Sequence, residues 1–132
     1  MNTDDVNPAP VGELVLRVMA MPMNANPHGD ISGGWLVAQM DTAAAIMAGR
    51  LANGRATTMA IGPMSFVRPV RIGAVVCCYA KVNNVGRSSV KVTIEVWCRM
   101  PEDAERHKVT EAEFVYVAID KDRRLRSIEK EA

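Results

Sequence analysis

One aspartate lies in the most helix-prone part of the sequence. Residues 33–48 are rich in good helix formers, contain no proline and carry a single charged residue, Asp41. On a helix, its neighbours on the same face are all small or apolar (Val37, Ala38, Ala44, Ala45 and Ala48). A carboxylate in such a stripe loses hydration, which costs several kcal/mol unless a partner compensates. Asp41 is therefore either a catalytic carboxylate, able to hold a water molecule or attack a carbonyl group, or a structural carboxylate with a partner.

Two glycines begin the same helix. Gly33 and Gly34 would let a ligand or another chain approach the backbone closely, and the N–H groups of the first helical turn could stabilise a negative charge developing on an oxygen atom. The alternative is that the glycines only permit tight packing. The preceding loop contains Asn26, whose side chain can both donate and accept hydrogen bonds. By itself, an asparagine in such a loop is typical of a turn.

The elements that must position these residues are one helix and several strands. The helix is predicted to begin at Ser32 or Gly33 and to end at Asn53-Gly54. Strand patterns cover residues 13–21, 55–61, 74–82, 89–100 and 109–119, with a turn at residues 83–86. Long strands joined by short turns pair in antiparallel fashion, and one nearly apolar helix is available to cover a sheet face. The sequence predicts an α+β domain in which an antiparallel five-stranded sheet wraps around one long central helix.

Composition limits the classes of function. The 132 residues suffice for one domain, predicted at residues 11–120 between a flexible N-terminal arm (1–10) and a charged, solvated and frayed C-terminal tail (121–132). Sixteen basic against fifteen acidic residues argue against nucleic-acid binding and against a polybasic membrane anchor. Three cysteines without metal-ligand spacing, and an N-terminus unlike a signal peptide, favour reduced thiols in the cytoplasm and no metal site. The helix is too short, and too polar at Gln39 and Asp41, to span a membrane.

Several segments together resemble one enzyme family. The first runs from Asn26 to Trp35 and continues at Gln39-Met40-Asp41. The others follow in order (Met64-Ser65-Phe66-Val67-Arg68-Pro69-Val70, residues 73–80, Ile94-Glu95-Val96-Trp97 and Thr110-Glu111-Ala112). Over roughly residues 14–120 the sequence resembles the hotdog-fold acyl-CoA thioesterases, and most closely the short bacterial YciA-type acyl-CoA thioester hydrolases. The resemblance implies a hotdog fold and hydrolysis of acyl-CoA to a free carboxylic acid and coenzyme A, without a metal or redox cofactor.

The resemblance also implies roles for individual residues. Asp41 matches the family's catalytic carboxylate, as general base or nucleophile, and Asn26 matches a loop asparagine that acts with it from the other subunit of a dimer. Such dimers commonly assemble into hexamers, as trimers of dimers. The thioester carbonyl group would lie over the helix N-terminus, near the N–H of Gly34. The resemblance further implies a set of residues that bind the substrate and its coenzyme A (Gly33, Phe66, Arg68, Gly86, Arg87, Ser88 and Ser89). An arginine beside serines suits a diphosphate, although residues 86–89 alone are typical of a polar hairpin turn.

Two other functions stay open at this point. His28 would be the general base if the protein were a hotdog dehydratase or hydratase acting on acyl thioesters, although it has no match in the thioesterase pattern. A non-catalytic acyl-CoA-binding module is the second alternative, and Asp41 argues against it because a pure binder gains little from a buried charge. The sequence departs from the family at Ala43-Ala44, where relatives often have glycines, and at Pro27-His28, which replaces a small-polar pair.

Overall fold

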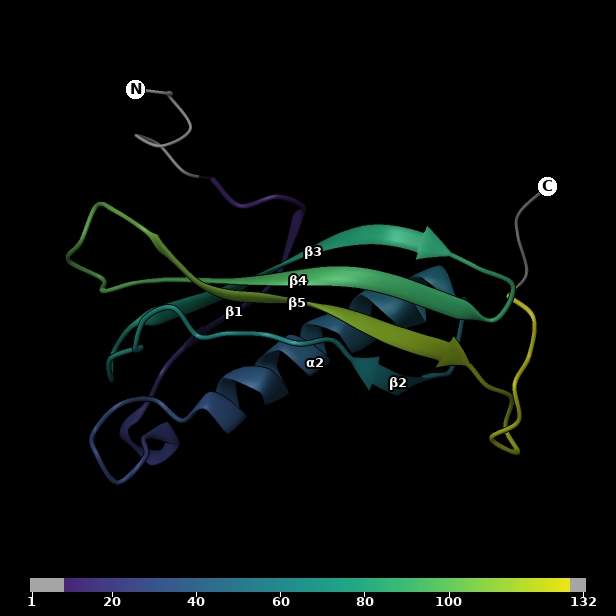
Figure 1. Cartoon of the computed structure of the whole chain (residues 1–132), viewed down its shortest axis with the longest axis horizontal. Helices are drawn as coiled ribbons and strands as arrows, with labels where there is room; N and C mark the ends of the chain where they lie inside the picture. The colour runs from purple at the N-terminus through teal and green to yellow at the C-terminus, as the bar shows by residue number, and fades with distance from the viewer. Residues whose placement is uncertain (1–8, 129–132) are drawn as a thin grey trace.

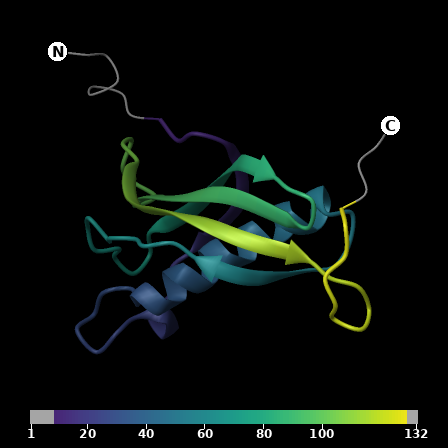
Figure 2. The same ribbon diagram turned by 45° about the vertical axis from the view of Figure 1, so that its right-hand side comes forward.

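A single antiparallel sheet and one long helix make up most of the computed structural model, which describes residues 9–128. The five strands are β1 (Glu13–Met19), β2 (Ala56–Ile61), β3 (Val75–Val85), β4 (Ser89–Arg99) and β5 (His107–Ala118), and they lie side by side in the order β1-β3-β4-β5-β2. A short 3-10 helix, η1 (Pro22–Asn24), and the long helix α2 (Gly33–Leu51) lie between β1 and β2 in the sequence. Figure 1 shows α2 running along one face of the sheet, and the turned view in Figure 2 shows the strands curving over it. The predicted α+β architecture is confirmed.

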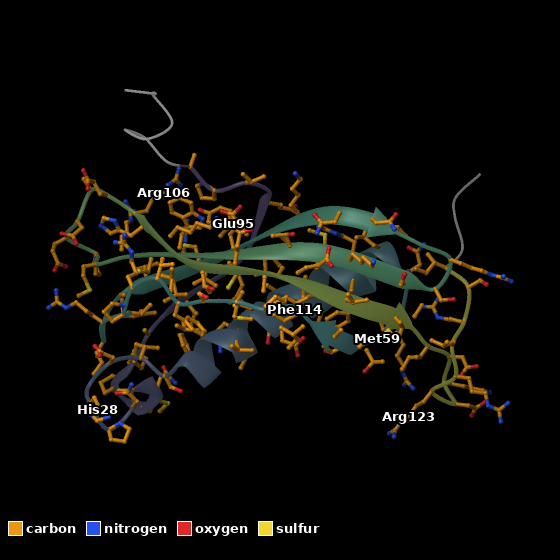
Figure 3. All side chains as sticks on the ribbon, viewed as in Figure 1. His28, Met59, Glu95, Arg106, Phe114 and Arg123 are labelled. Atoms are coloured by element: carbon orange, nitrogen blue, oxygen red, sulfur yellow. The ribbon has the colours of Figure 1, made fainter. Side chains whose placement is uncertain are left out.

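The core lies between α2 and the sheet. The helix buries one side, on which apolar residues return every three or four positions (Leu36, Met40, Ala43, Ala44, Met47 and Ala48). β4 turns alternate residues toward this side, and all of them from Val90 to Val96 are fully buried. Phe114 of β5, also fully buried, lies between the sheet and the helix (Figure 3). Because three of the helical residues are alanines, α2 comes close enough to contact all five strands.

Helix α2 begins and ends where the sequence predicts. Ser32 is its N-cap, with extended backbone angles (φ −61°, ψ 133°), and Ala52 is its C-cap. The next two residues have positive φ, 53° at Asn53 and 147° at Gly54. Asparagine and glycine tolerate such angles, and the helix cannot continue through them. No helix within residues 9–128 is long and apolar enough to cross a membrane.

Strand β3 is longer than predicted. Asn83 and Asn84 continue the strand, although the sequence favours a turn there, and the hairpin turn follows at residues 86–88. A register shift after Val82 accommodates the two asparagines. The side-chain NH₂ of Asn83 donates to the hydroxyl of Thr93 (2.7 Å) and to the carboxylate of Glu113 (3.0 Å) on the next two strands. The predicted turn is therefore wrong for residues 83–85, because these cross-strand hydrogen bonds outweigh the local turn preference of asparagine.

The segment after β5 packs against the domain as far as Ile128. Arg126 donates hydrogen bonds to three backbone carbonyl oxygens, at 2.9, 3.0 and 3.2 Å (Ile119, Ala52 and Arg55). Ile128 is 7% exposed. The prediction of a solvated, frayed tail is therefore wrong for Arg126 and Ile128, because a guanidinium can satisfy carbonyl groups near a helix C-terminus, whereas residues 121–125 are exposed. Residues 1–8 of the predicted N-terminal arm and residues 129–132 lie outside the described residues.

Candidate active site

Asp41 lies on the third turn of α2, where the buried side of the helix meets its exposed side. The sequence predicts that apolar surroundings exclude water from Asp41. This holds on one side only, since Ala44 and Ala48 are buried whereas Ala38 and Ala45 are exposed. Asp41 itself is partly exposed. Its carboxylate is thus accessible from outside the core, and a water molecule or a ligand can reach it.

Two neutral side chains hold one oxygen of the Asp41 carboxylate. Oδ1 accepts hydrogen bonds from the hydroxyl of Thr58 on β2 (2.9 Å) and from the hydroxyl of Tyr116 on β5 (2.5 Å). The Tyr116 hydroxyl also lies 3.0 Å from the backbone carbonyl oxygen of Asp41. No donor among residues 9–128 is hydrogen-bonded to the second oxygen, Oδ2. The carboxylate is therefore oriented through Oδ1, and Oδ2 is left to accept a proton from water or to attack a carbonyl carbon.

Tyr116 is the principal partner of Asp41. It is 2% exposed, and its pKa is raised to about 12, first by burial and then by its hydrogen bond to the Asp41 carboxylate. Tyr116 is therefore a neutral hydroxyl donor near pH 7. The sequence analysis singles out neither Tyr116 nor Thr58. The signal for Tyr116 is its inward position two residues after Phe114, since a buried tyrosine hydroxyl usually has a partner. The sequence gives no indication that this partner is Asp41, 75 residues away.

The N-terminus of α2 forms a second part of the candidate site. The Ser32 side chain makes no capping hydrogen bond, so it leaves the N–H groups of the first turn available. A β-carbon added at Gly33 would lie 3.5 Å from the ring of Phe66, and one added at Gly34 would lie 3.5 Å from the Ser32 hydroxyl. Both are ordinary van der Waals distances, so packing within one chain requires neither glycine. This favours the interpretation that the glycines give access to the backbone.

Asn26 shapes the loop in front of this helix. Its Oδ1 accepts hydrogen bonds from the backbone N–H groups of His28 (2.9 Å) and Asp30 (3.2 Å), which confirms a turn-forming role. None of the hydrogen bonds of the described residues uses its NH₂ group, which is therefore left to donate to a ligand. Asn26 lines a hollow of about 400 Å³ together with Gly33 and Phe66. A role in catalysis stays a prediction.

His28 lies on the outside of the same loop. It is exposed, and Figure 3 shows its ring directed away from α2. It does not line the hollow that contains Asn26 and Gly33. A general base must come within hydrogen-bond reach of the proton it removes. The geometry therefore gives no support to a dehydratase that uses His28.

One chain brings Asn26, Gly33, Phe66 and Arg68 around this hollow, but not Asp41. Asp41 lies eight positions after Gly33 along α2, a distance of about 12 Å at 1.5 Å per residue. A carboxylate cannot act across that distance on a carbonyl group bound at the first turn. Asp41 and the hollow of its own chain therefore do not act on the same carbonyl.

The predicted coenzyme A residues are divided between the two ends of β4. Arg68 shares a hollow with Arg99, the last residue of the strand, whereas Arg87 precedes its first residue, Ser89. A strand of eleven residues is roughly 35 Å long at about 3.3 Å per residue. One chain thus does not bring Arg68 and Arg87 to the same phosphate group.

The backbone of the turn at residues 86–89 is hydrogen-bonded within the turn and to later segments of the chain. The N–H of Gly86 donates to the carbonyl oxygen of Ser89 (2.8 Å), and the carbonyl oxygens of Arg87 and Ser88 each accept from a later N–H at 2.7 Å (Ile128 and Ala118, respectively). The Arg87 side chain is exposed. The hydrogen bonds fit an ordinary polar hairpin turn, and a role in coenzyme A binding stays a prediction.

The cysteines are free thiols. Burial raises the pKa of Cys78, to about 12, and that of Cys98, so both behave as small core residues. Within residues 9–128, no group of three or more His, Cys, Asp or Glu side chains could hold a metal ion.

Comparison with known proteins decides the family. A sequence model of the thioesterase superfamily matches residues 28–104, more than half of the chain. The chain belongs to the thioesterase superfamily. The matched region of this superfamily member contains Asp41, both helix-initiating glycines and Arg68, and it begins just after Asn26.

Individual relatives agree with this membership. The acyl-CoA thioester hydrolase YciA of Salmonella typhimurium is 48% identical over 122 residues, which are 90% of this chain and 92% of the relative. The hexameric thioesterase y2039 from Yersinia pestis is 46% identical, with a TM-score of 0.88 over 93% of this chain and 100% of that one. Cj0915, a hexameric hotdog fold thioesterase of Campylobacter jejuni, is 37% identical, with a TM-score of 0.83 over 89% and 91% of the two chains. The hotdog fold expected of this superfamily member is confirmed.

Proposed function

We propose that this protein is an acyl-CoA thioesterase, which hydrolyses acyl-CoA to a free carboxylic acid and coenzyme A. The observation that carries the proposal is the Asp41 carboxylate, whose Oδ1 is held by Thr58 and Tyr116 and whose Oδ2 accepts no hydrogen bond from residues 9–128. Membership of the thioesterase superfamily, and the name of the Salmonella typhimurium relative, support a thioester as the substrate.

In the proposed mechanism, Asp41 supplies the negative charge that drives the reaction. As a general base, it takes a proton from water, and the hydroxide attacks the thioester carbonyl carbon. As a nucleophile, it attacks the carbonyl carbon directly, and water then hydrolyses the mixed anhydride. In both cases the C–S bond breaks and coenzyme A leaves as the thiolate, which is then protonated. The first-turn N–H groups of α2, with that of Gly34 among them, stabilise the negative charge that develops on the carbonyl oxygen.

We propose further that a second subunit completes each site. Asp41 of one chain would face Asn26 and Gly34 of the partner subunit, because Asp41 lies about 12 Å along α2 from the first turn of its own chain. Two exposed apolar surfaces near Asp41 support such a dimer. One is the outer side of α2, where Ile46 is 49% exposed, and the other is the free edge of the sheet at β2, where Met59 is 68% exposed (Figure 3). An edge strand with exposed apolar side chains readily pairs with another strand.

Three such dimers would form a hexamer, as the names of the Yersinia pestis and Campylobacter jejuni relatives describe for those proteins. A hexamer of 14.4 kDa chains has a mass of about 86 kDa, which light scattering measures directly. In the assembly, Arg68 beside the hollow of one chain and the Arg87 turn of another would hold the phosphates of coenzyme A. The free thiols are consistent with a cytoplasmic protein, as the sequence predicts.

The test of the function is Asp41→Asn, which keeps the shape of the side chain and removes its charge. Thiol release from acyl-CoA should proceed with a kcat lower by about 10²–10⁴, the usual size of a lost acid–base role, and a nearly unchanged KM. Asp122→Asn makes the same change in an exposed part of the C-terminal segment and should leave kcat unaltered. Wild-type turnover by Asp41→Asn, with a normal melting curve, would disprove the proposal.

The test of the shared site combines two inactive variants. Asp41→Asn and Asn26→Ala chains, co-expressed and purified as mixed oligomers, should regain part of the activity that each lacks alone, because some sites then receive both native residues. Mixed oligomers as inactive as their parents, or a monomer that hydrolyses acyl-CoA, would contradict a site built from two subunits.

A further inference from the structure

A second hollow lies on the face of the sheet that points away from α2. It measures about 320 Å³, and its lining among residues 9–128 includes three arginines and no acidic residue: Arg17 of β1, Arg99 of β4 and Arg106 of the loop before β5. Arg17 is paired with Cys77 and Cys77 with Trp97 across three neighbouring strands, so their side chains share this face. Figure 3 shows Arg106 on the side of the sheet opposite α2. The hollow shares no residue with the one beside Asn26.

Within the described part of the chain, the three guanidinium groups have no acidic partners. Among residues 9–128, the ion pairs within 4.0 Å involve Arg50 and Lys108, and none involves Arg17, Arg99 or Arg106. Arg17 donates through Nε to the sulfur of Cys77 at 3.5 Å, which leaves its two terminal NH₂ groups available. Three positive charges around one hollow repel one another, and an anion bound between them would remove that repulsion.

The wall behind these arginines is fixed by a buried network. Trp97 is 4% exposed and Glu95 is 6% exposed, and the indole N–H donates to the Glu95 carboxylate at 2.9 Å. Lys108 lies 3.8 Å from the same carboxylate and also forms a closer ion pair with Glu111, so the charge of Glu95 is partly compensated. The guanidinium carbon of Arg106 lies 5.8 Å from the centre of the Trp97 ring, a cation–π distance. The network thus holds Trp97 in place, and the Trp97 ring in turn positions Arg106 at the hollow.

We propose that this hollow is a binding site for a small molecule that carries a diphosphate group. Arginine offers a planar fork of N–H donors that matches phosphate oxygens, and three such forks around one space suit two linked phosphates better than one. A volume of about 320 Å³ is at the lower end of the range for small-molecule sites and admits a ligand of mononucleotide size. The site shares no residue with the hollow at the N-terminus of α2 and does not include Asp41, although Arg99 also lines the hollow that contains Arg68. The proposal does not depend on the proposed hydrolysis.

Calorimetric titration of the wild-type protein with pyrophosphate, inorganic phosphate and ADP tests the site. Pyrophosphate and ADP should bind at least tenfold more tightly than phosphate. The double variant Arg17→Ala/Arg99→Ala should lose about 100-fold in affinity for both, at roughly tenfold for each lost charged contact. Lys91→Ala is the matched control, because it removes a positive charge from the same strand and face but away from the hollow, and it should bind as the wild type does.

Enzyme kinetics of the double variant show whether the bound diphosphate belongs to acyl-CoA or to another compound. A higher KM for acyl-CoA, together with lost ADP binding, would show that the hollow holds the diphosphate of the substrate. An unchanged KM with lost ADP binding would show that it holds another diphosphate compound. Failure of pyrophosphate and ADP to bind the wild type, binding retained by the double variant, or an equal loss in Lys91→Ala would overturn the proposal. Because titration needs no turnover, a protein that binds pyrophosphate without hydrolysing acyl-CoA would refute only the proposed function.

Discussion

The hydroxyl of Tyr116 offers the sharpest test of how Asp41 is positioned. Tyr116→Phe removes only the atom that lies 2.5 Å from Oδ1, and phenylalanine fills the same buried space. Thr58 remains at 2.9 Å from the same oxygen. The variant should therefore keep its fold and its substrate affinity while the carboxylate loses the closer of its two partners.

The expected size of the effect follows from these contacts. A hydrogen bond to a charged group contributes about 1.5–3 kcal/mol, which corresponds to roughly 10- to 150-fold in a rate if it acts wholly in the transition state. Because Thr58 retains part of the orientation, we expect kcat to fall by about 10- to 30-fold. Thr58→Val should have a smaller effect, and the double variant should lose more than the two single variants together, since both hydroxyls bond to one oxygen.

Thiol release from acyl-CoA, followed over a range of substrate concentrations, separates kcat from KM. Tyr79→Phe removes the other tyrosine hydroxyl of the chain, which lies on the opposite face of the sheet and lines the second hollow. It is the control for kcat, which it should leave unchanged, and not for KM. Equal rates for Tyr116→Phe and the wild type would refute the view that Tyr116 orients a catalytic carboxylate. A large rise in KM without a change in kcat would place Tyr116 in substrate binding instead.

Three further predictions concern the coenzyme, pH and the C-terminal segment. Arg68→Ala and Arg87→Ala should each raise KM more for CoA esters than for pantetheine esters, and equal effects on both esters would place the phosphates elsewhere. The pKa of Tyr116, about 12, exceeds the tyrosine value of 10 in the unfolded chain, so its contribution to stability is complete below pH 10 and is lost as the pH rises through 12. Urea unfolding should show this loss in the wild type and a smaller loss in Tyr116→Phe. Arg126→Ala should lower the free energy of unfolding by about 2 kcal/mol, seen as a Tm lower by about 5–10 °C, whereas the exposed Arg124→Ala should leave the Tm unchanged.

The fold is largely predictable from the sequence because its main signals are local. The spacing of apolar residues along α2 and the unbroken alternation of β4 each report a periodicity that the structure retains. The extension of β3 through Asn83 is not predictable in this way. It depends on hydrogen bonds to Thr93 and Glu113, and these become neighbours only when three strands have paired.

In the candidate site, too, residues with a local sequence signal are predictable and residues that depend on tertiary contacts are not. Asp41 and Gly34 are detectable because a charge and a glycine are conspicuous within one apolar helix. Thr58 and Tyr116 bond to Asp41 from two other elements, so their chemistry has no local signature. The three arginines of the second hollow are separated by up to 89 positions, and only the register of the sheet brings them together.

The contacts made by Arg126 and Ile128 have a consequence for synthesis on the ribosome. Arg126 bonds to the carbonyl oxygen at the end of α2, 74 positions earlier, and the N–H of Ile128 bonds to the turn between β3 and β4, 41 positions earlier. These contacts cannot form until residues 126 and 128, respectively, have left the exit tunnel, although α2 and the β3–β4 hairpin emerge long before. During most of its elongation, the nascent chain therefore lacks the hydrogen bond from Arg126 to the end of α2 and the hydrogen bond from Ile128 to the β3–β4 turn. The hydrogen bond that fixes the turn with Arg87 can therefore form only after the rest of the sheet has emerged.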